Sequence, residues 1–180
     1  MSSMKKKEPF VSVLTPVYNG GKFLEECIQS VLKQNYENWE YVIVDNQSTD
    51  NSSEIIEKYA SQNRRIRVHH NENFLPQMQN LNNAFRQISP ESKYCKVVHA
   101  DDWLFPDCLS KMVKVAEEHP SVGIVSSYRL DEKLVNLDGL PYPSTCNPGR
   151  EIAKNYLKKG TSYFGSPSSL LLRTDLILKR

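Results

Sequence analysis

Short β-branched apolar runs alternate with amphipathic helical stretches along the first two thirds of this chain, and this alternation constrains the fold more than any other feature. The runs read VSVL, EYVIV, IRVHH, YCKVV and VGIVSSY, and apolar residues return at the three-and-four spacing of a helix after each of the first four. Strands that alternate with helices pair in parallel through right-handed crossovers. The pattern predicts a single Rossmann-like α/β sandwich, with a mostly parallel central sheet and helices on both faces.

The pattern changes after Arg129, where several prolines and a predicted turn at Asp138-Gly139 indicate an extended segment that departs from the alternation of strands and helices. A short helix near Ile152–Leu157 and a strand at Ser168–Arg173 are predicted to follow. We therefore divide the chain into a flexible basic tail (1–9), an α/β core (10–128) and a final region of different character (129–180).

Charge and hydropathy exclude several classes of protein. The 180 residues suit one domain, and no apolar run approaches the roughly 18 residues that a membrane span needs. The net charge of +2 gives no reason to expect a nucleic-acid partner. Lys5, Lys6 and Lys7 form a short basic cluster, interpreted as a solvated tail, with a weak peripheral attraction to acidic lipid as the alternative.

The cysteines indicate the compartment. Cys27, Cys95, Cys108 and Cys146 include no C-x-x-C pair, and residues 1–10 lack the apolar core of a signal peptide. We therefore expect reduced thiols in a cytoplasmic protein, with the inner face of the membrane as an alternative location.

Polar residues follow three of the predicted strands. Thr15–Asn19 come after the first strand, Asp45 and Asn46 after the second, and His99–Asp102 after the fourth. Ligands of parallel α/β sheets bind at the carboxyl ends of the strands. We therefore expect these three segments to converge at one edge of the sheet.

Asp101 and Asp102 are adjacent carboxylates at the end of a buried strand. Asp107, just after Pro106, is predicted to cap the next helix, which leaves the pair without that role. Two neighbouring carboxylates repel each other unless a cation lies between them and another anion, and a hard divalent ion that also binds phosphate oxygens suits this arrangement. From the residues alone, a metal and phosphate site and a structural carboxylate cluster both remain open.

Common nucleotide motifs are missing from the sequence. The segment NGGK (19–22) lacks the G-x-x-x-x-G-K-[ST] frame of a P-loop, and there is no G-x-G-x-x-G. A P-loop kinase and a dinucleotide-dependent oxidoreductase are therefore disfavoured.

Two longer segments carry a family resemblance. VSVLTPVYNGGKFLEECIQSVLKQNYENWEYVIVDNQSTDNS resembles the opening of family 2 nucleotide-sugar glycosyltransferases, and HADDWLFPDCL resembles their acidic metal motif. The resemblance runs over roughly residues 9–173. It implies a GT-A fold and a metal-dependent, inverting transfer of sugar from a nucleotide-diphosphate donor, of the UDP or dTDP type. The acceptor would be a polysaccharide, a lipid-linked saccharide or another glycan.

By this resemblance, residues 10–128 form the nucleotide-sugar-binding core, and 129–180 begin an incomplete acceptor-side region. Thr15, Pro16 and Tyr18 would border the nucleobase, and Asp45 would accept a hydrogen bond from the base. Asp101 would lie at the ribose.

The resemblance also assigns a cofactor. Asp101 and Asp102 would hold a divalent ion, Mn²⁺ or Mg²⁺, that bridges the diphosphate. The family commonly has an aspartate where His99 stands, and for His99 a metal ligand, a phosphate contact and a packing role all remain open.

Two further departures from the family pattern bear on donor binding and catalysis. The family often has an arginine after the third strand, and Gln77, Asn80 or Asn83 stand in its place here. The family's catalytic base follows the strand that GSPSSLLLR resembles, so we expect it beyond Arg180. A nucleotide-binding fragment that lacks the base is therefore an alternative function. A sugar-phosphate nucleotidyltransferase is a weaker one, because its Gly-rich N-terminal loop is not visible.

Overall fold

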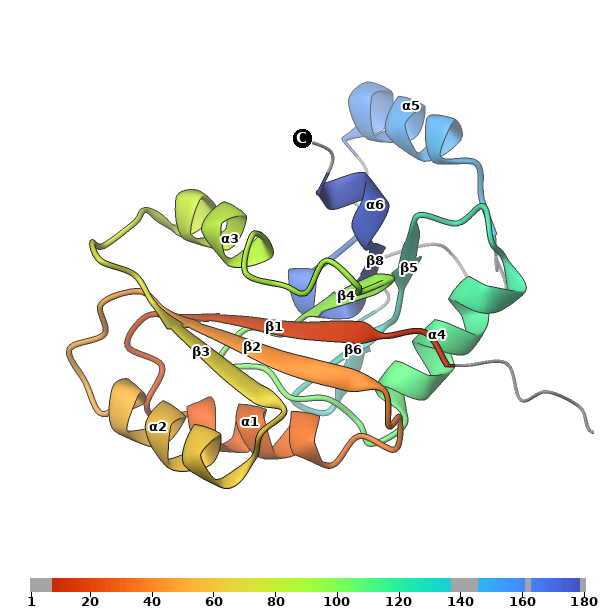
Figure 1. Ribbon diagram of the computed structural model, residues 1–180. Helices are drawn as coiled ribbons and strands as arrows, with labels where there is room; N and C mark the ends of the chain where they lie inside the picture. Colours follow the sequence, from red (N-terminus) through yellow and green to blue (C-terminus); the bar gives the residue numbers. More distant parts are fainter. Residues whose placement is uncertain (1–7, 137–145, 161–162, 179–180) are drawn as a thin grey trace, which may run out of the picture.

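A central sheet covered by helices on both faces forms the body of the molecule (Figure 1). The computed structural model describes residues 8–136, 146–160 and 163–178. The strands are β1 (Val11–Val17), β2 (Trp39–Asp45), β3 (Ile66–His70), β4 (Tyr94–Val97), β5 (Ile124–Ser126), β6 (Arg129–Asp131), β7 (Leu134–Asn136) and β8 (Leu170–Arg173). The helices are α1 (Leu24–Leu32), α2 (Ser52–Gln62), α3 (Gln77–Phe85), α4 (Cys108–Glu118), α5 (Gly149–Lys159) and α6 (Thr174–Ile177), with a 3₁₀ turn η1 (Pro167–Ser169).

The sheet has the order β3-β2-β1-β4-β8-β5. The first four strands in this order are parallel, and β8 runs antiparallel to both β4 and β5. The prediction of a mostly parallel sheet is confirmed. Because β1 lies between β2 and β4, the carboxyl ends of these three strands are neighbours. This agrees with the prediction that the polar segments after these strands converge at one edge of the sheet.

Burial explains why β1 and β2 read as continuous apolar runs. Nearly every residue of both strands is buried, as expected for parallel strands that are covered on both faces. One core packs α1, α2 and α4 against one face of the sheet, through residues such as Ile28, Ile56 and Leu109. The second core packs α3 and α6 against the other face, around Leu14 and Val42.

The prediction that the Asp107 side chain caps α4 is wrong. Asp107 is the N-cap residue, but its side chain makes no capping hydrogen bond and forms an ion pair with Lys111 instead. Gln34, just after α1, supplies the cap, because its Oε1 accepts a hydrogen bond from the Leu109 N–H at 3.0 Å. The partner lies 75 residues away in the chain, so a local pattern could not identify it.

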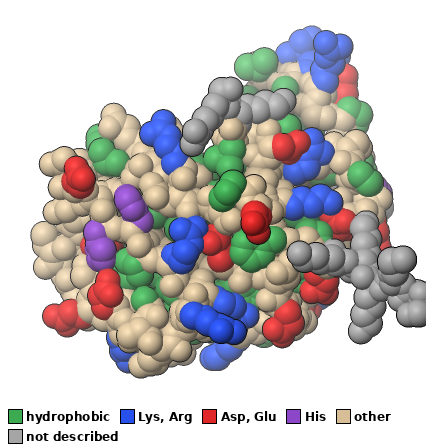
Figure 2. Space-filling model, in the orientation of Figure 1, with side chains coloured by type: hydrophobic (Ala, Val, Ile, Leu, Met, Phe, Trp, Pro, Cys, Tyr) green, Lys and Arg blue, Asp and Glu red, His purple; other side chains and the backbone are tan. Residues whose placement is uncertain are grey.

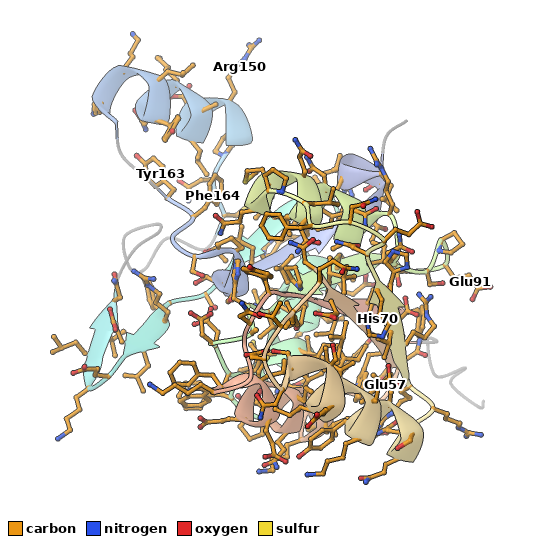
Figure 3. All side chains as sticks on the ribbon, turned by 90° about the vertical axis from the view of Figure 1, so that its left-hand side faces the viewer. Glu57, His70, Glu91, Arg150, Tyr163 and Phe164 are labelled. Atoms are coloured by element: carbon orange, nitrogen blue, oxygen red, sulfur yellow. The ribbon has the colours of Figure 1, made fainter. Side chains whose placement is uncertain are left out.

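The last third of the chain differs from its prediction in two places. The helix predicted at Ile152–Leu157 is confirmed as α5. The strand predicted at Ser168–Arg173 is confirmed over Leu170–Arg173 as β8, whereas its first two residues belong to the 3₁₀ turn η1. The antiparallel hairpin of β6 and β7 was not predicted, and it turns through Glu132 at a φ of 53°. The turn predicted at Asp138-Gly139 lies outside the described residues, as do Lys5, Lys6 and Lys7. In Figure 3 the hairpin and α5 stand away from the body of the molecule.

The charged side chains are interspersed on the face seen in Figure 2, where acidic and basic groups alternate over the surface. Among the described residues, no helix combines the length and the apolar character that crossing a membrane requires.

Candidate functional site

A pocket of about 570 Å³ brings together the ends of β1, β2 and β4 and the beginning of α3. Its lining residues are Pro16, Val17, Tyr18, Asn19, Gly20, Phe23, Asn46, Phe74, Leu75, Gln77, Met78, Asn80, Leu81, His99, Ala100, Asp101 and Pro167. The pocket therefore lies at the carboxyl edge of the sheet, where parallel α/β folds bind ligands.

Four of the residues predicted from the sequence line this pocket, namely Pro16, Tyr18, His99 and Asp101. Asp102 belongs to the same turn, is half-buried, and donates its N–H to the His99 carbonyl at 3.0 Å. Thr15 and Asp45 do not line the pocket.

Thr15 lies beneath the pocket, in a buried chain of polar groups. Its Oγ1 lies 2.9 Å from the Tyr41 hydroxyl, and that hydroxyl lies 3.7 Å from the Cys27 Sγ. The Cys27 thiol donates to the His99 carbonyl at 3.4 Å. Burial raises the pKa of Cys27 to about 11, so the thiol stays protonated and acts as a donor. The chain of contacts links β1, β2, α1 and the end of β4.

Asp45 is only 4% exposed, and protein groups surround its carboxylate. The Ser48 N–H donates to Oδ1 at 3.2 Å, the Ser53 hydroxyl donates to Oδ2 at 2.9 Å, and His70 Nδ1 lies 3.2 Å from Oδ2. Burial would raise the pKa of Asp45, but these hydrogen bonds outweigh it and the pKa lies below its usual range. Asp45 is therefore an ionised group that ties the end of β2 to its neighbours.

Asn46 lines the pocket. The sequence placed it in one of the three converging segments but gave it no role in the site. Its Nδ2 donates to the Leu75 carbonyl at 2.8 Å, and its Oδ1 accepts the Leu75 N–H at 2.9 Å. The pair of bonds fixes the segment before α3 against the end of β2. The signal in the sequence was its position as the second polar residue after the strand.

A cluster of asparagines extends this contact into α3. Asn71 Nδ2 donates to Asn46 Oδ1 at 2.7 Å and to Asn80 Oδ1 at 2.9 Å, and Asn83 Nδ2 donates to Asn71 Oδ1 at 2.8 Å. Of the three polar residues considered in place of an arginine, Gln77 and Asn80 line the pocket and Asn83 does not. Gln77 is exposed, whereas Asn80 is buried in this cluster.

The rim of the pocket carries exposed aromatic side chains. The rings of Tyr18 and Phe74 lie 4.9 Å apart in a tilted arrangement, and both side chains are about half exposed. Phe23 and Met78 are exposed on the same rim. Aromatic faces of this kind can stack on a planar base or on the apolar face of a sugar.

The loop after β1 approaches the turn after β4 closely. A Cβ atom at Gly20 would lie 3.0 Å from the Ala100 Cβ, so a side chain there would displace the turn that carries Asp101. The Gly20 N–H donates to Ser52 Oγ at 2.9 Å and the Gly21 N–H to Asp50 Oδ2 at 2.9 Å. These bonds hold the loop between α2 and the carboxylate turn.

The donor atoms available for a metal ion are carboxylate oxygens. Within the described ranges, no three His, Cys, Asp or Glu side chains converge as a metal site. Asp101 and Asp102 offer two adjacent carboxylates on an accessible turn. Such a pair fits Mg²⁺ or Mn²⁺, because these ions are often bound through one or two carboxylates and complete their coordination with phosphate oxygens and water.

The sequence matches a known family along nearly its whole length. The family model for glycosyl transferase family 2 matches residues 12–179. The chain is 37% identical over 123 residues to the glycosyltransferase GlyG of Streptococcus pneumoniae, covering 68% of this chain and 40% of that protein. It is 30% identical over 138 residues to the putative teichuronic acid biosynthesis glycosyltransferase TuaG of Bacillus subtilis, covering 77% of this chain and 52% of TuaG.

Solved structures agree with these matches. Residues 1–349 of Staphylococcus aureus TarS in complex with UDP superpose with a TM-score of 0.72 at 25% identity, covering 93% of this chain and 47% of that one. The Pyrobaculum calidifontis mannosyltransferase PcManGT, in complex with GDP-Man and Mn²⁺, gives a TM-score of 0.61 at 27% identity, covering 69% of this chain and 37% of that one. The chain thus spans about half or less of the length of these relatives.

Proposed function

This chain belongs to glycosyltransferase family 2 and has the GT-A fold, and from this premise we propose that it transfers a sugar from a nucleotide-diphosphate donor to a saccharide or lipid-linked acceptor. The observation that carries the proposal is the pocket at the carboxyl ends of β1, β2 and β4. An aromatic rim and a carboxylate turn border this one pocket, so it suits a ligand with a base at one end and a diphosphate at the other.

The nucleobase is assigned to the side of the pocket formed by Pro16 and Tyr18. The Tyr18 ring is exposed and lies beside Phe74, so either ring can stack on the base. Thr15 and Asp45 support this side from beneath, through Tyr41 and through the partners of the Asp45 carboxylate. UDP is the first nucleotide to test, because a relative at 25% identity was solved in complex with it.

The diphosphate and a divalent metal ion are assigned to the turn of Asp101 and Asp102. Bound there, the metal ion would neutralise negative charge that develops on the departing nucleoside diphosphate. His99 lines the same side of the pocket and is within the segment that would face the phosphates. A relative in complex with Mn²⁺ makes manganese the first ion to test.

The reaction proposed is a single displacement with inversion. The acceptor hydroxyl oxygen attacks the anomeric carbon, the bond from that carbon to the diphosphate oxygen breaks, and its electron pair leaves with the nucleoside diphosphate. The hydroxyl proton passes to a base, a step worth about 10²–10⁴-fold in rate. None of the residues assigned above is that base. Asp131 and Glu132 are exposed on the hairpin, and Asp175 is paired with Arg173, so these late acidic residues are not assigned to it.

The experiment is titration calorimetry of the chain with UDP, with and without Mn²⁺. We expect binding that depends on Mn²⁺, and a loss of at least about tenfold in affinity for Asp101→Asn and Asp102→Asn, because each change removes a charged metal ligand. Asp107→Asn is the matched control, since it removes one carboxylate from the same loop but lies outside the pocket.

Unchanged Mn²⁺-dependent binding by both variants would contradict the assignment of the carboxylate turn. If UDP does not bind, dTDP and GDP are tested in the same way, and failure of all three would contradict the proposed function. Binding without turnover of any sugar donor would favour the alternative of a nucleotide-binding fragment.

A further inference from the structure

Lys96 is a lysine in the middle of a buried strand. It belongs to β4, where its register partners are Val13 of β1 and Leu171 of β8, and its exposed fraction is 0%. An ammonium group removed from water is costly unless hydrogen bonds compensate it. Burial lowers the pKa of Lys96, and the nearby side chains of Cys108 and Asp102 act in the opposite direction.

The ammonium group of Lys96 contacts the segment that enters β8. Its Nζ donates a hydrogen bond to the main-chain carbonyl of Ser168, in η1. The Ser168 hydroxyl in turn accepts the His99 N–H at 2.9 Å. Ser168 of η1 is therefore held twice, through its carbonyl by Lys96 of β4 and through its hydroxyl by His99, which follows β4.

The same turn forms part of the pocket. Pro167, next to Ser168, lines the pocket together with His99, Ala100 and Asp101. Lys96 lies five residues before Asp101 on the strand that leads to it. The contact thus joins the carboxylate turn to a segment about 70 residues later in the chain.

We propose that Lys96 is a positioning residue for glycosyl transfer, because it holds η1 in place as the wall of the pocket beside Asp101 and Asp102. The inference rests on the proposed function in one respect, namely that the pocket binds a nucleotide diphosphate. Holding η1 against β4 is a separate property, which can be measured without a ligand.

The first test compares hydrogen exchange in the parent chain and in Lys96→Met. Methionine fills a similar volume without charge or donor, so the variant should fold, although the Ser168 carbonyl loses its partner. We expect exchange in residues 164–171 to become about tenfold faster, because the segment loses a charge-assisted hydrogen bond. Lys114→Met is the control, since Lys114 is exposed on α4. Equal exchange rates for Lys96→Met and the parent would overturn the proposal.

A second variant keeps the proposal testable if Lys96→Met does not fold. Ser168→Ala retains the carbonyl that Lys96 holds and loses only the bond from His99. Exchange in residues 164–171 should then rise by less than about twofold. A rise of about tenfold would mean that the His99 bond positions the segment, and that Lys96 does not.

The third measurement separates positioning from a general loss of structure. With Mn²⁺ present, Lys96→Met should bind UDP about fivefold more weakly, but UMP less than twofold more weakly, because only the diphosphate reaches the Pro167 side of the pocket. An equal loss for both ligands would overturn the positioning role. If the parent binds neither UDP nor UMP, the comparison is repeated with the diphosphate and monophosphate of thymidine and of guanosine, and the exchange rates still decide whether Lys96 holds η1.

Discussion

His70 lies between two carboxylates at the end of β3, where its ring joins the end of β2 to α2. Its Nε2 lies 3.0 Å from Glu57 Oε1 and its Nδ1 lies 3.2 Å from Asp45 Oδ2. Figure 3 shows the side chains of Glu57 and His70 next to each other. The hydrogen bond with Glu57 raises the pKa of His70 above its usual value of 6.5, burial opposes this, and the contact with Asp45 adds to it.

The raised pKa predicts how the stability of the fold depends on pH. Because the folded-state pKa lies above the unfolded one, the stabilisation is complete below about pH 6.5 and is lost as the pH rises through the folded value. His70→Gln should therefore lower the melting temperature more at about pH 5.5 than at about pH 8.5. The effect should correspond to at most about 1 kcal/mol, because the ring is nearly half exposed.

Thermal melts of the parent and the variant at the two pH values measure this difference. His69→Gln on the same strand is the control. A difference between parent and His70→Gln that does not change with pH would show that the ring contributes no proton-linked stability.

Individual residues differ in how far the sequence could predict them. Pro16, Tyr18 and Asp101 were predicted for the site from their places at strand ends, and the structure puts all three on the pocket. Asn46 was placed at the same edge but received no role, because the role at the end of the second strand was given to Asp45. Only the fold reveals that Asn46, and not Asp45, lines the pocket. For Lys96, the signal was a single charged residue inside the apolar run YCKVV.

At the scale of elements, α3 is held to the sheet by a polar contact as well as by apolar packing. Asn71, directly after β3, is 4% exposed and bonds to Asn46, Asn80 and Asn83. The cluster thereby fixes the start of α3, where Gln77 and Met78 face the pocket.

Removing the central side chain should loosen this element. We expect Asn71→Ala to lower the free energy of unfolding by about 2–3 kcal/mol, because the remaining asparagines lose partners in a buried site. This corresponds to roughly 5–10 °C in melting temperature for a chain of this size. Asn82→Ala, at an exposed position of α3, is the control. Equal melting temperatures for the two variants would show that apolar packing alone holds the helix.

The elements also show where prediction from sequence ends. The strands β1 to β4 and the helices α1 to α4 were predicted, because their periodicity is local and strong. The hairpin of β6 and β7 was not, since two three-residue strands carry too little pattern. The cap of α4 was wrong because Gln34, far away in the chain, replaces the side chain of Asp107.

At the scale of the whole molecule, burial is unevenly distributed. Nearly every residue of β1 and β2 is buried, whereas α5 contains no buried residue. In Figure 3, Tyr163 and Phe164 lie below α5, where the chain returns to the body. The parts of the molecule should therefore open at very different free energies.

Amide hydrogen exchange measures this gradient. We expect amides in the middle of β1 and β2 to exchange at least about 10³-fold more slowly than those of α5, because the strands open only with the whole fold. Comparable protection of α5 and β2 would mean that another surface covers α5 in solution.

The direction and neighbours of β8 were beyond the reach of the sequence. A run such as SSLLLR indicates a strand but carries no information about its partner, and β8 enters between β4 and β5 in antiparallel orientation. The predicted division of the chain into a tail, a core to residue 128 and a final region remains a prediction.

The position of β8 has a consequence for the order in which the sheet can assemble during synthesis. β5 is made more than 40 residues before β8, yet β8 is the strand to which it is hydrogen-bonded. As the nascent chain emerges, β3, β2, β1 and β4 can already pair, while β5 has to wait with its main-chain groups unpaired. The segment between β5 and β8, which contains the hairpin and α5, is therefore synthesised before the sheet is complete. β8 is the last strand to be made, and it inserts between β4 and β5.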